Sequence, residues 1–507
     1  MTRVIVTVII CVSFVTSSLA FTSSPILSTL RDEKAVFPRM KDYTKVMRRQ
    51  SILYSSLKEE DKEPTIKSNW ILGLCVPLWL AYVSNQWSRS SIYYLVDFSE
   101  QGNAFQAMNI DLNFSKSQYG VLASVAFTSL FAIASLLAGI ASDRYNRKVL
   151  TVVSVATWGL ATLGTSYSSS YEQVVGWRIL MGLSCAFSTP TAYTLLADRV
   201  PSDRVASATS FYSTGISLGG ALASLSILLD TRIGWRNTAF AIACFAFLSM
   251  TINALLLEDD SKDSNKKAEK LNPSSEESEN SSIEELKKVL MSSNRVNFLY
   301  LASFFRFCSG LLIGVWSAPY FREIFPDNAD DYAVAQAFIT ATCGIISSII
   351  GGFAADRLKQ SMGSTTDDDA IGRQLWVPVV GNLLATPAWY MAIHNGQSFP
   401  IAMTWLAIEY LVAECWFGPT ISVLQSSVGS KIGGTAQGLF TITGAFGNLA
   451  PAVLGYIYDQ QRLDSASSSN DELTILLTAS VCGCYVLSAI FFGASALSSR
   501  PAKLNES

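Results

Sequence analysis

A short segment occurs twice in this chain, each time at the end of a long apolar stretch. The first copy is Gly139-Ile-Ala-Ser-Asp143-Arg144 and the second is Gly352-Phe-Ala-Ala-Asp356-Arg357. A glycine four residues before an Asp-Arg pair lets two membrane helices approach closely, and it places a carboxylate and a guanidinium at the membrane surface, where they can pair. The repeat therefore predicts two related halves that each carry a charged hinge.

Composition places these halves in a membrane. Half of the 507 residues are hydrophobic and only 15% are charged. A helix needs roughly 20 mostly apolar residues to cross a bilayer. Stretches of this kind begin near Trp70, Gln118, Val149, Tyr171, Ala206, Asn237, Val296, Tyr332, Leu375, Phe399, Gly433 and Leu473. The sequence therefore predicts an all-α membrane protein with about twelve transmembrane helices, arranged as two six-helix pseudo-repeats.

Polar stretches between the apolar blocks give the predicted domain boundaries. Residues 69–257 form an N-terminal six-helix bundle, 258–295 a polar linker, 296–498 a C-terminal six-helix bundle, and 499–507 a tail. Lys and Arg gather after the second, fourth and eighth spans, so both termini and the linker are expected on the cytosolic side. The net charge of -3 is spread over the loops and gives no indication of nucleic-acid binding.

The first 68 residues have the features of targeting sequences. Residues 1–20 combine Arg3, an apolar run and small residues before Phe21, as in a signal peptide, and residues 21–68 are rich in Ser, Thr, Lys and Arg, as in a transit peptide. Together they resemble the bipartite presequences of algae with secondary plastids, which implies a plastid envelope protein. A plain secretory signal or a disordered tail, with residence in the plasma membrane or an endomembrane, is the alternative.

Reactive side chains are few, and they indicate no enzyme. His394 is the single histidine, most of the nine cysteines fall within apolar spans, and Cys482-Gly-Cys484 lacks metal-ligand spacing. A nucleophile with a neighbouring base cannot be assembled from this inventory. We therefore expect no enzymatic activity, no cofactor and no metal.

The halves, the linker and the repeated Gly-x-x-x-Asp-Arg motif resemble the major facilitator superfamily of secondary transporters, from about Trp70 to Leu497. The first motif continues as Asp143-Arg-Tyr-Asn-Arg147-Lys148, which is similar to the Spinster family of lipid transporters. Further similarity lies in Asn85-Gln-Trp-Ser-Arg89, Arg178-Ile-Leu-Met-Gly182 and Trp416-Phe-Gly-Pro419. The resemblance implies a monomeric carrier that moves a lysolipid-like or sphingolipid-like anion by alternating access.

The chain departs from the Spinster pattern at two places. Ser88-Arg89 stands where those proteins usually have Asp-Arg, and Gly182-Leu-Ser-Cys185-Ala186 stands where they have Gly-x-Gly-Glu-Ala. Because both family carboxylates are replaced by neutral residues, the family's route of proton coupling is not expected here. Facilitated diffusion, exchange, and titration of another group all stay open.

Charged side chains inside apolar spans are candidates for substrate contact, because each costs several kcal/mol unless it is paired or faces water. Arg89, Arg178 and Arg306 lie in the first, fourth and seventh predicted spans. The first and seventh helices correspond in the repeat, so Arg89, with Asn85 on the same helix, is expected to face Arg306 across an anionic headgroup. Snorkelling, or pairing with backbone carbonyls, is the alternative.

Two carboxylates, Glu409 and Glu414, lie on the predicted tenth helix. At about 100° per residue their five-residue separation turns them to different faces, so one of them is expected in the cavity. Glu414, close to Trp416, is the preferred candidate for a proton-coupled step. A buried ion pair with an arginine is the alternative.

The resemblance assigns the two motifs to a gate on the cytosolic side. Its residues are Gly139, Asp143, Arg144, Arg147 and Lys148 in the first half, and Gly352, Asp356 and Arg357 in the second. Rocking of one half against the other would break and remake the pairs. An organic-anion or phosphate-ester exchanger also fits the arginines, and a non-transporting receptor or scaffold is the alternative of another class, although a static scaffold has no use for a gate.

Overall fold

The computed structural model describes residues 70–99, 106–201, 204–258, 290, 293–360, 367–395, 398–428, 433–464 and 469–498. The predicted signal segment 1–20, the transit-like segment 21–68, nearly all of the linker 258–295 and the tail 499–507 lie outside these residues. The description below concerns the compact unit that runs from Ile71 to Ser507.

Every regular element among the described residues is helical, as predicted. The N-terminal half contains η2 (Ile71–Cys75), α3 (Val76–Ser90), η3 (Ser91–Tyr93), α4 (Met108–Asp111), α5 (Lys116–Gly120), η4 (Val121–Val125), α6 (Ala126–Arg144), α7 (Arg147–Ser166), α8 (Tyr171–Cys185), α9 (Ser188–Arg199) and α10 (Val205–Leu256). Helix α10 covers the fifth and sixth predicted spans, which are separated by a kink at Gly234. The φ angle of Gly234 is 80°, a conformation that favours glycine because it has no Cβ.

The C-terminal half repeats this pattern. Its elements are α13 (Asn294–Ile324), η5 (Pro326–Asn328), α14 (Ala329–Phe338), η6 (Ile339–Cys343), α15 (Gly344–Gln360), α16 (Asp367–Arg373), α17 (Trp376–His394), α18 (Phe399–Ala413), η7 (Glu414–Trp416), α19 (Phe417–Val428), α20 (Gly433–Gly447), α21 (Ala450–Asp464) and α22 (Ser469–Leu497). Short π-helical or 3-10 pieces interrupt the second, eighth and tenth passes of the chain.

Nine helical stretches within the described residues are long and apolar enough to cross a membrane, and the stretch Ala208–Leu256 is long enough for two passes. Helices α3 and α17 match the first and ninth predicted spans but are not among the nine. Helix α3 has only 15 residues and carries the polar side chains Asn85, Gln86 and Arg89, of which Asn85 and Arg89 are candidate site residues. The prediction of an all-α, multi-pass protein is confirmed.

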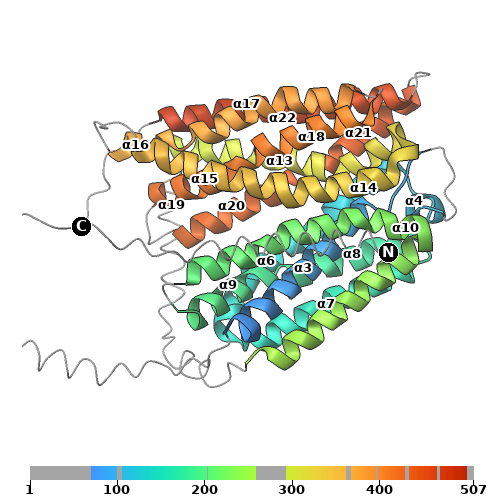
Figure 1. The fold of residues 1–507 in the computed structure, drawn as a ribbon, viewed down its shortest axis with the longest axis horizontal. Helices are drawn as coiled ribbons and strands as arrows, with labels where there is room; N and C mark the ends of the chain where they lie inside the picture. Colours follow the sequence, from blue (N-terminus) through green and yellow to red (C-terminus); the bar gives the residue numbers. More distant parts are fainter. Residues whose placement is uncertain are drawn as a thin grey trace, which may run out of the picture. The chain divides into compact units, whose positions relative to one another are not determined.

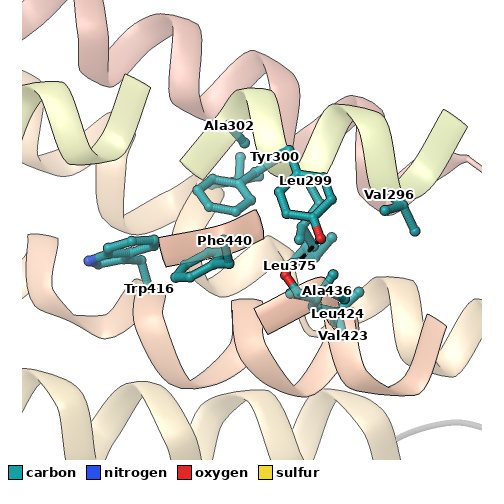
Figure 2. Close-up of a cluster of buried hydrophobic side chains, with 12 residues drawn as sticks. Val296, Leu299, Tyr300, Ala302, Leu375, Trp416, Val423, Leu424, Ala436 and Phe440 are labelled. Carbon is teal, nitrogen blue, oxygen red and sulfur yellow. Dashed lines mark hydrogen bonds between the residues drawn. The ribbon is translucent and has the colours of Figure 1, made fainter. Parts of the chain in front are cut away.

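Each half is held together by its own apolar core. In the N-terminal bundle α10 packs against α3 and α7, and in the C-terminal bundle α22 packs against α13 and α17 (Figure 1). The first core includes Phe127, Trp158 and Met181. Figure 2 shows the second core, in which the Tyr300 hydroxyl donates a 2.9 Å hydrogen bond to the Ala436 carbonyl.

Close helix packing in the second motif uses a different glycine from the predicted one. A Cβ built on Gly352 would meet nothing within 4 Å, whereas one built on Gly351 would lie 2.6 Å from the Cys415 carbonyl oxygen. Adjacent residues on a helix point about 100° apart, so only one of the pair can face the neighbouring helix. The prediction that Gly352 allows close helix approach is therefore wrong for this conformation.

Candidate functional site

The candidate site of the N-terminal half centres on Arg178 of α8. Its side chain is buried, and its Nη1 makes a 3.4 Å contact with the Met181 sulfur. Its Nε and Nη2 atoms have no hydrogen-bond partner, and among the described residues no carboxylate lies within ion-pair distance. A buried guanidinium without hydrogen-bond partners or an ionic partner costs free energy unless an anion binds to it.

Arg89 lies beside Arg178 on an aromatic surface formed by Phe127. The guanidinium carbon of Arg89 lies 4.7 Å from the centroid of the Phe127 ring, and that of Arg178 lies 5.2 Å from it. Cation–π contact stabilises a guanidinium while leaving its edge N–H groups free to bind another group. Two positive side chains thus share one ring, and neither forms an ion pair with a described residue.

Gly182 fixes the position of Phe127. A Cβ built on Gly182 would lie 2.0 Å from the Phe127 carbonyl oxygen, so α6 and α8 can touch here only because residue 182 is glycine. Phe127 is itself buried and stacks on Phe131, with 5.3 Å between the ring centroids. The Arg-x-x-x-Gly spacing on α8 therefore places both Arg178 and the ring beneath it.

Two further donors lie on α3 in the same half. The Asn85 Nδ2 and the Ser88 Oγ are buried and have no hydrogen-bond partner among the described residues. Cys185 interacts electrostatically with both Arg89 and Arg178. The structure thus brings together Asn85, Arg89 and Arg178, and every unsatisfied atom named here carries hydrogen to donate.

The arginine of the C-terminal half is paired instead. Arg306 of α13 is buried, and its Nη2 donates 3.0 Å hydrogen bonds to the Glu414 Oε1 and to the Ala413 carbonyl. Trp416 and Tyr485 lie over its guanidinium, with centroid distances of 5.2 and 5.4 Å. The ion pair that we considered as the alternative for Glu414 is therefore present, whereas Arg178 has no such pair.

A break in the helix brings both carboxylates of the tenth pass to Arg306. Glu414 begins η7, so the regular 100° rotation used to separate it from Glu409 does not extend across this position. Glu409 is buried and accepts a hydrogen bond from the Tyr485 hydroxyl, and both glutamates interact electrostatically with Arg306. The Glu414 side chain is 39% exposed, so it reaches open space while Glu409 does not.

An apolar cavity of about 240 Å³ lies between the halves. It is lined by residues of α6, of α20, and of the chain from Ala186 into α9; these are Phe131, Ala132, Ser135, Ala186, Thr189, Pro190, Gly438, Thr441 and Ile442. Phe131 stacks on Phe127, and Ala186 follows Cys185 in the chain. Phe127 and Cys185 in turn interact with both Arg89 and Arg178. The cavity lining therefore includes a ring, Phe131, that stacks on the Phe127 ring beneath Arg89 and Arg178.

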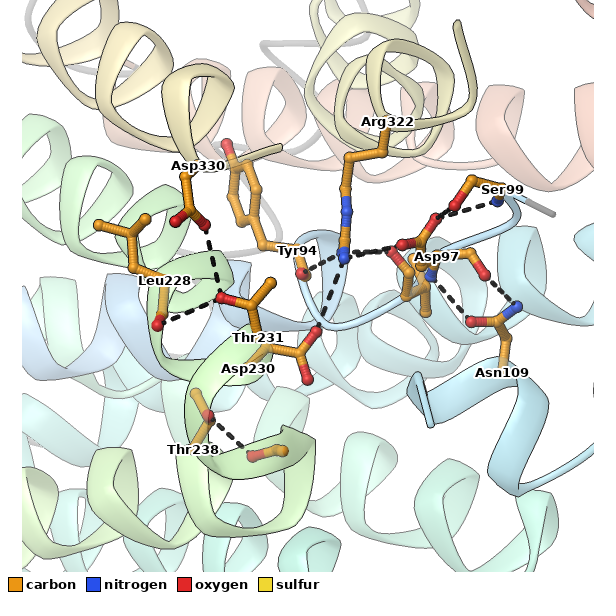
Figure 3. A network of polar contacts seen from close by, with 12 residues as sticks. Tyr94, Asp97, Ser99, Asn109, Leu228, Asp230, Thr231, Thr238, Arg322 and Asp330 are labelled. Atoms are coloured by element: carbon orange, nitrogen blue, oxygen red, sulfur yellow. Dashed lines mark hydrogen bonds and ion pairs between the residues drawn. The ribbon is translucent and has the colours of Figure 1, made fainter. Parts of the chain in front are cut away.

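The end of the bundle opposite the Asp-Arg motifs, which we call the distal face, is closed by ionic contacts between the halves. Arg322 of α13 donates 3.1 and 2.8 Å hydrogen bonds to the carbonyls of Tyr94 and Val96, and its Nη2 lies 3.0 Å from the Asp97 Oδ2 (Figure 3). The same Nη2 lies 3.8 Å from the Asp230 Oδ2 of α10. The side chains of Arg322 and both aspartates are buried.

A second set of distal contacts joins α5 to α13 and α21. The Lys116 Nζ lies 2.7 Å from the Glu323 Oε2 and donates a 3.2 Å hydrogen bond to the Tyr458 hydroxyl. The Ser115 hydroxyl donates to Asp459 over 2.7 Å, and the Tyr119 hydroxyl donates to the Val315 carbonyl over 2.6 Å. Sequence reasoning missed this closure, although Asp230, an acid directly after an apolar run in the fifth span, was the signal that could have revealed it.

The predicted cytosolic gate is only partly described. The side chains of Asp143 and Arg144, and the burial of Gly139, lie outside what the structure describes. Arg147 is buried and bonds within its own half, to the Asp198 carboxylate at 2.6 Å and the Ser142 carbonyl at 2.9 Å. Lys148 is half-buried in the first turn of α7, while Asp356 and Arg357 are exposed and make no ion pair with any described residue.

This chain is similar to known proteins. The profile described as Major Facilitator Superfamily matches residues 78–451. A probable sulfoacetate transporter of Cupriavidus necator is 23% identical over 388 residues, which are 75% of this chain and 86% of that protein. A probable hexose phosphate transport protein of Chlamydia trachomatis is 23% identical over 415 residues, 76% of this chain and 84% of that protein.

A solved structure shows the same fold. The bacterial homologue of the human lysosomal transporter Spinster, in an inward-facing and unoccupied conformation, has a TM-score of 0.65 to this chain at 17% identity, covering 85% of this chain and 96% of that one. At this identity the likeness shows the fold alone. With the family profile covering most of the chain and both bundles of the expected fold present, this chain belongs to the Major Facilitator Superfamily and is a multi-pass membrane transporter.

Proposed function

We propose that this transporter carries a small organic anion that binds between Arg178 and Arg89. The observation that carries the proposal is the buried Arg178 guanidinium, which has two unsatisfied nitrogen atoms and no carboxylate partner among the described residues. A carboxylate, sulfonate or phosphate group would accept forked hydrogen bonds from these nitrogens and offset the buried charge. Asn85 and Ser88 supply further donors on the adjacent helix.

The relatives favour a small anion over a lipid. The names of the two relatives reported above specify sulfoacetate and hexose phosphate, both small organic anions. The lysolipid expectation rests on the Spinster resemblance, and the likeness to the Spinster homologue extends to the fold only. The small-anion reading also replaces the predicted pair of Arg89 and Arg306 by Arg89 and Arg178, because Arg306 is already bonded to Glu414.

Thermal unfolding of the purified protein in detergent tests this proposal. A ligand that binds only the folded protein stabilises it by about 2.7 kcal/mol at a hundred times its Kd. We expect sulfoacetate or glucose 6-phosphate to raise the unfolding temperature of the wild type, and Arg178→Gln to abolish that shift. Arg232→Gln, which removes an exposed arginine, should retain it.

Lipid ligands give the contrasting outcome. Stabilisation by lysophospholipids or sphingoid phosphates, with none from the small anions, would assign the site to a lipid headgroup. An anion shift of equal size in Arg178→Gln and in the wild type would show that the anion binds elsewhere.

We also infer from residues 1–68 that this transporter resides in a plastid envelope. A signal-like segment is followed along the chain by a transit-like segment, and this order supports a plastid location. A fluorescent fusion that lacks residues 1–20 is expected to lose plastid delivery, while one that lacks the tail 499–507 keeps it. Plastid fluorescence unchanged by the first deletion would contradict the inference.

A further inference from the structure

We propose that Asp230 is a proton-binding site, and that the distal face closes only when Asp230 carries a proton. The proposal goes beyond the transported anion: it assigns a ligand, the proton, to a buried acid that contacts no candidate substrate residue. Asp230 lies in a cluster with two other charged side chains, Arg322 and Asp97 (Figure 3).

The charges of this cluster do not balance. One guanidinium, Arg322, faces two carboxylates, Asp97 and Asp230, and all three side chains are at most 7% exposed. If both aspartates were ionised, a net negative charge would lie buried between the halves. Burial of an uncompensated charge costs several kcal/mol, and a buried carboxylate avoids this cost by binding a proton.

Hydrogen bonding indicates which aspartate stays ionised. The Asp97 Oδ1 accepts hydrogen bonds from the Ser99 backbone N–H at 2.9 Å and from the Ser99 hydroxyl at 2.7 Å, and its Oδ2 accepts one from Arg322 at 3.0 Å. Such donors stabilise a carboxylate. Asp230 has Arg322 at 3.8 Å as its one ionic partner, and no hydrogen bond to its carboxylate joins it to any described residue. The proton therefore belongs on Asp230.

Among the residues that the structure describes, neighbouring groups supply no second positive charge. On α14, Asp330 is exposed and lies 3.4 Å from the Thr231 hydroxyl, and Tyr332 interacts electrostatically with Arg322. On α10 itself, Arg232 is exposed. On the segment after α3, Tyr94 offers its carbonyl to Arg322.

Two other distal cations are already matched with partners. Lys116 pairs with Glu323, and Arg236 pairs with Asp111. Neither pair leaves a cation over for Asp230.

Closure and protonation are coupled because the two partners lie on different halves. Asp230 belongs to α10 of the N-terminal half and Arg322 to α13 of the C-terminal half. When the halves separate at the distal face, water reaches Asp230 and the carboxylate ionises. The closed state thus binds one proton more than the open state, so acid favours closure, and the ratio of closed to open molecules falls up to about tenfold per pH unit as pH rises.

Distances between spin labels across the distal face test the proposal without any anion, so its failure is distinguishable from failure of the proposed function. A ketone-bearing amino acid replaces Ile110 on α4 and Asp327 of η5, which are both exposed, and each ketone carries one spin label. Because this labelling does not use thiols, the native cysteines stay in place. In the full-length protein in nanodiscs, we expect a short distance near pH 5 and a growing long-distance population toward about pH 9.

Asp230→Asn, which mimics the protonated side chain in size, is expected to keep the short distance throughout this range. Asp330→Asn, the same substitution at the exposed neighbouring acid, should keep the wild-type pH dependence. A wild-type distribution that does not respond to pH would overturn the proposal. So would an Asp230→Asn protein that titrates like the wild type or that stays open.

Discussion

Gly182→Ala is expected to destabilise the protein by on the order of 3 kcal/mol and to abolish stabilisation by small anions. The added Cβ would lie 2.0 Å from the Phe127 carbonyl oxygen, which is backbone and cannot rotate away. Helices α6 and α8 would have to separate, and overpacking of this kind typically costs about 1–3 kcal/mol, occasionally more. The separation would also move the Phe127 ring away from Arg178 and Arg89, so binding would be lost together with stability.

Gly176→Ala is the matched control for this change. Gly176 lies on the same helix, and a Cβ there would meet nothing within 4 Å. Thermal unfolding of both variants, with and without sulfoacetate or glucose 6-phosphate, separates a local steric effect from a general effect of alanine on α8. Equal unfolding temperatures for the two variants would contradict the close approach at Gly182.

Glu414→Gln is expected to cost about 2–3 kcal/mol of stability. It leaves Arg306 buried with a neutral partner in place of its carboxylate. Breaking a fully buried pair typically costs about 3–5 kcal/mol, and we expect less here because Glu414 is 39% exposed and partly solvated. The measurement is the unfolding temperature of the single variants and of the double variant.

A double-mutant cycle with Arg306→Met distinguishes the two roles considered for Glu414. If the pair is structural, the double variant should lose less stability than the sum of the single variants, because it lacks both charges of the Arg306–Glu414 pair. If Glu414 instead carries a proton during transport, Glu414→Gln should remove the pH dependence of transport with little change in unfolding temperature. The second outcome would contradict a purely structural pair.

The expected closure residues differ from those found because closure depends on the conformation. Sequence reasoning located a gate at the Asp-Arg motifs, where Asp356 and Arg357 are exposed in this structure. Among the described residues, the ionic contacts between the halves lie at the opposite end, and they include those of Arg322 with Asp97 and Asp230. The Asp-Arg gate stays a prediction for a state in which the distal face is open.

The sequence by itself determined the fold, because hydrophobic spans of sufficient length and a repeated motif are local patterns. It also identified Arg89, Arg178 and Arg306 as candidates, because a charge within an apolar span is costly wherever the helix packs. Only the tertiary structure decided which of them has a carboxylate partner. Arg306 meets Glu414 from another helix, Arg178 meets no described carboxylate, and Arg322 joins two aspartates that lie far from it in the chain. Whether a buried charge has a partner depends on which residues helix packing brings next to it. Those neighbours cannot be read from the order of residues along the chain.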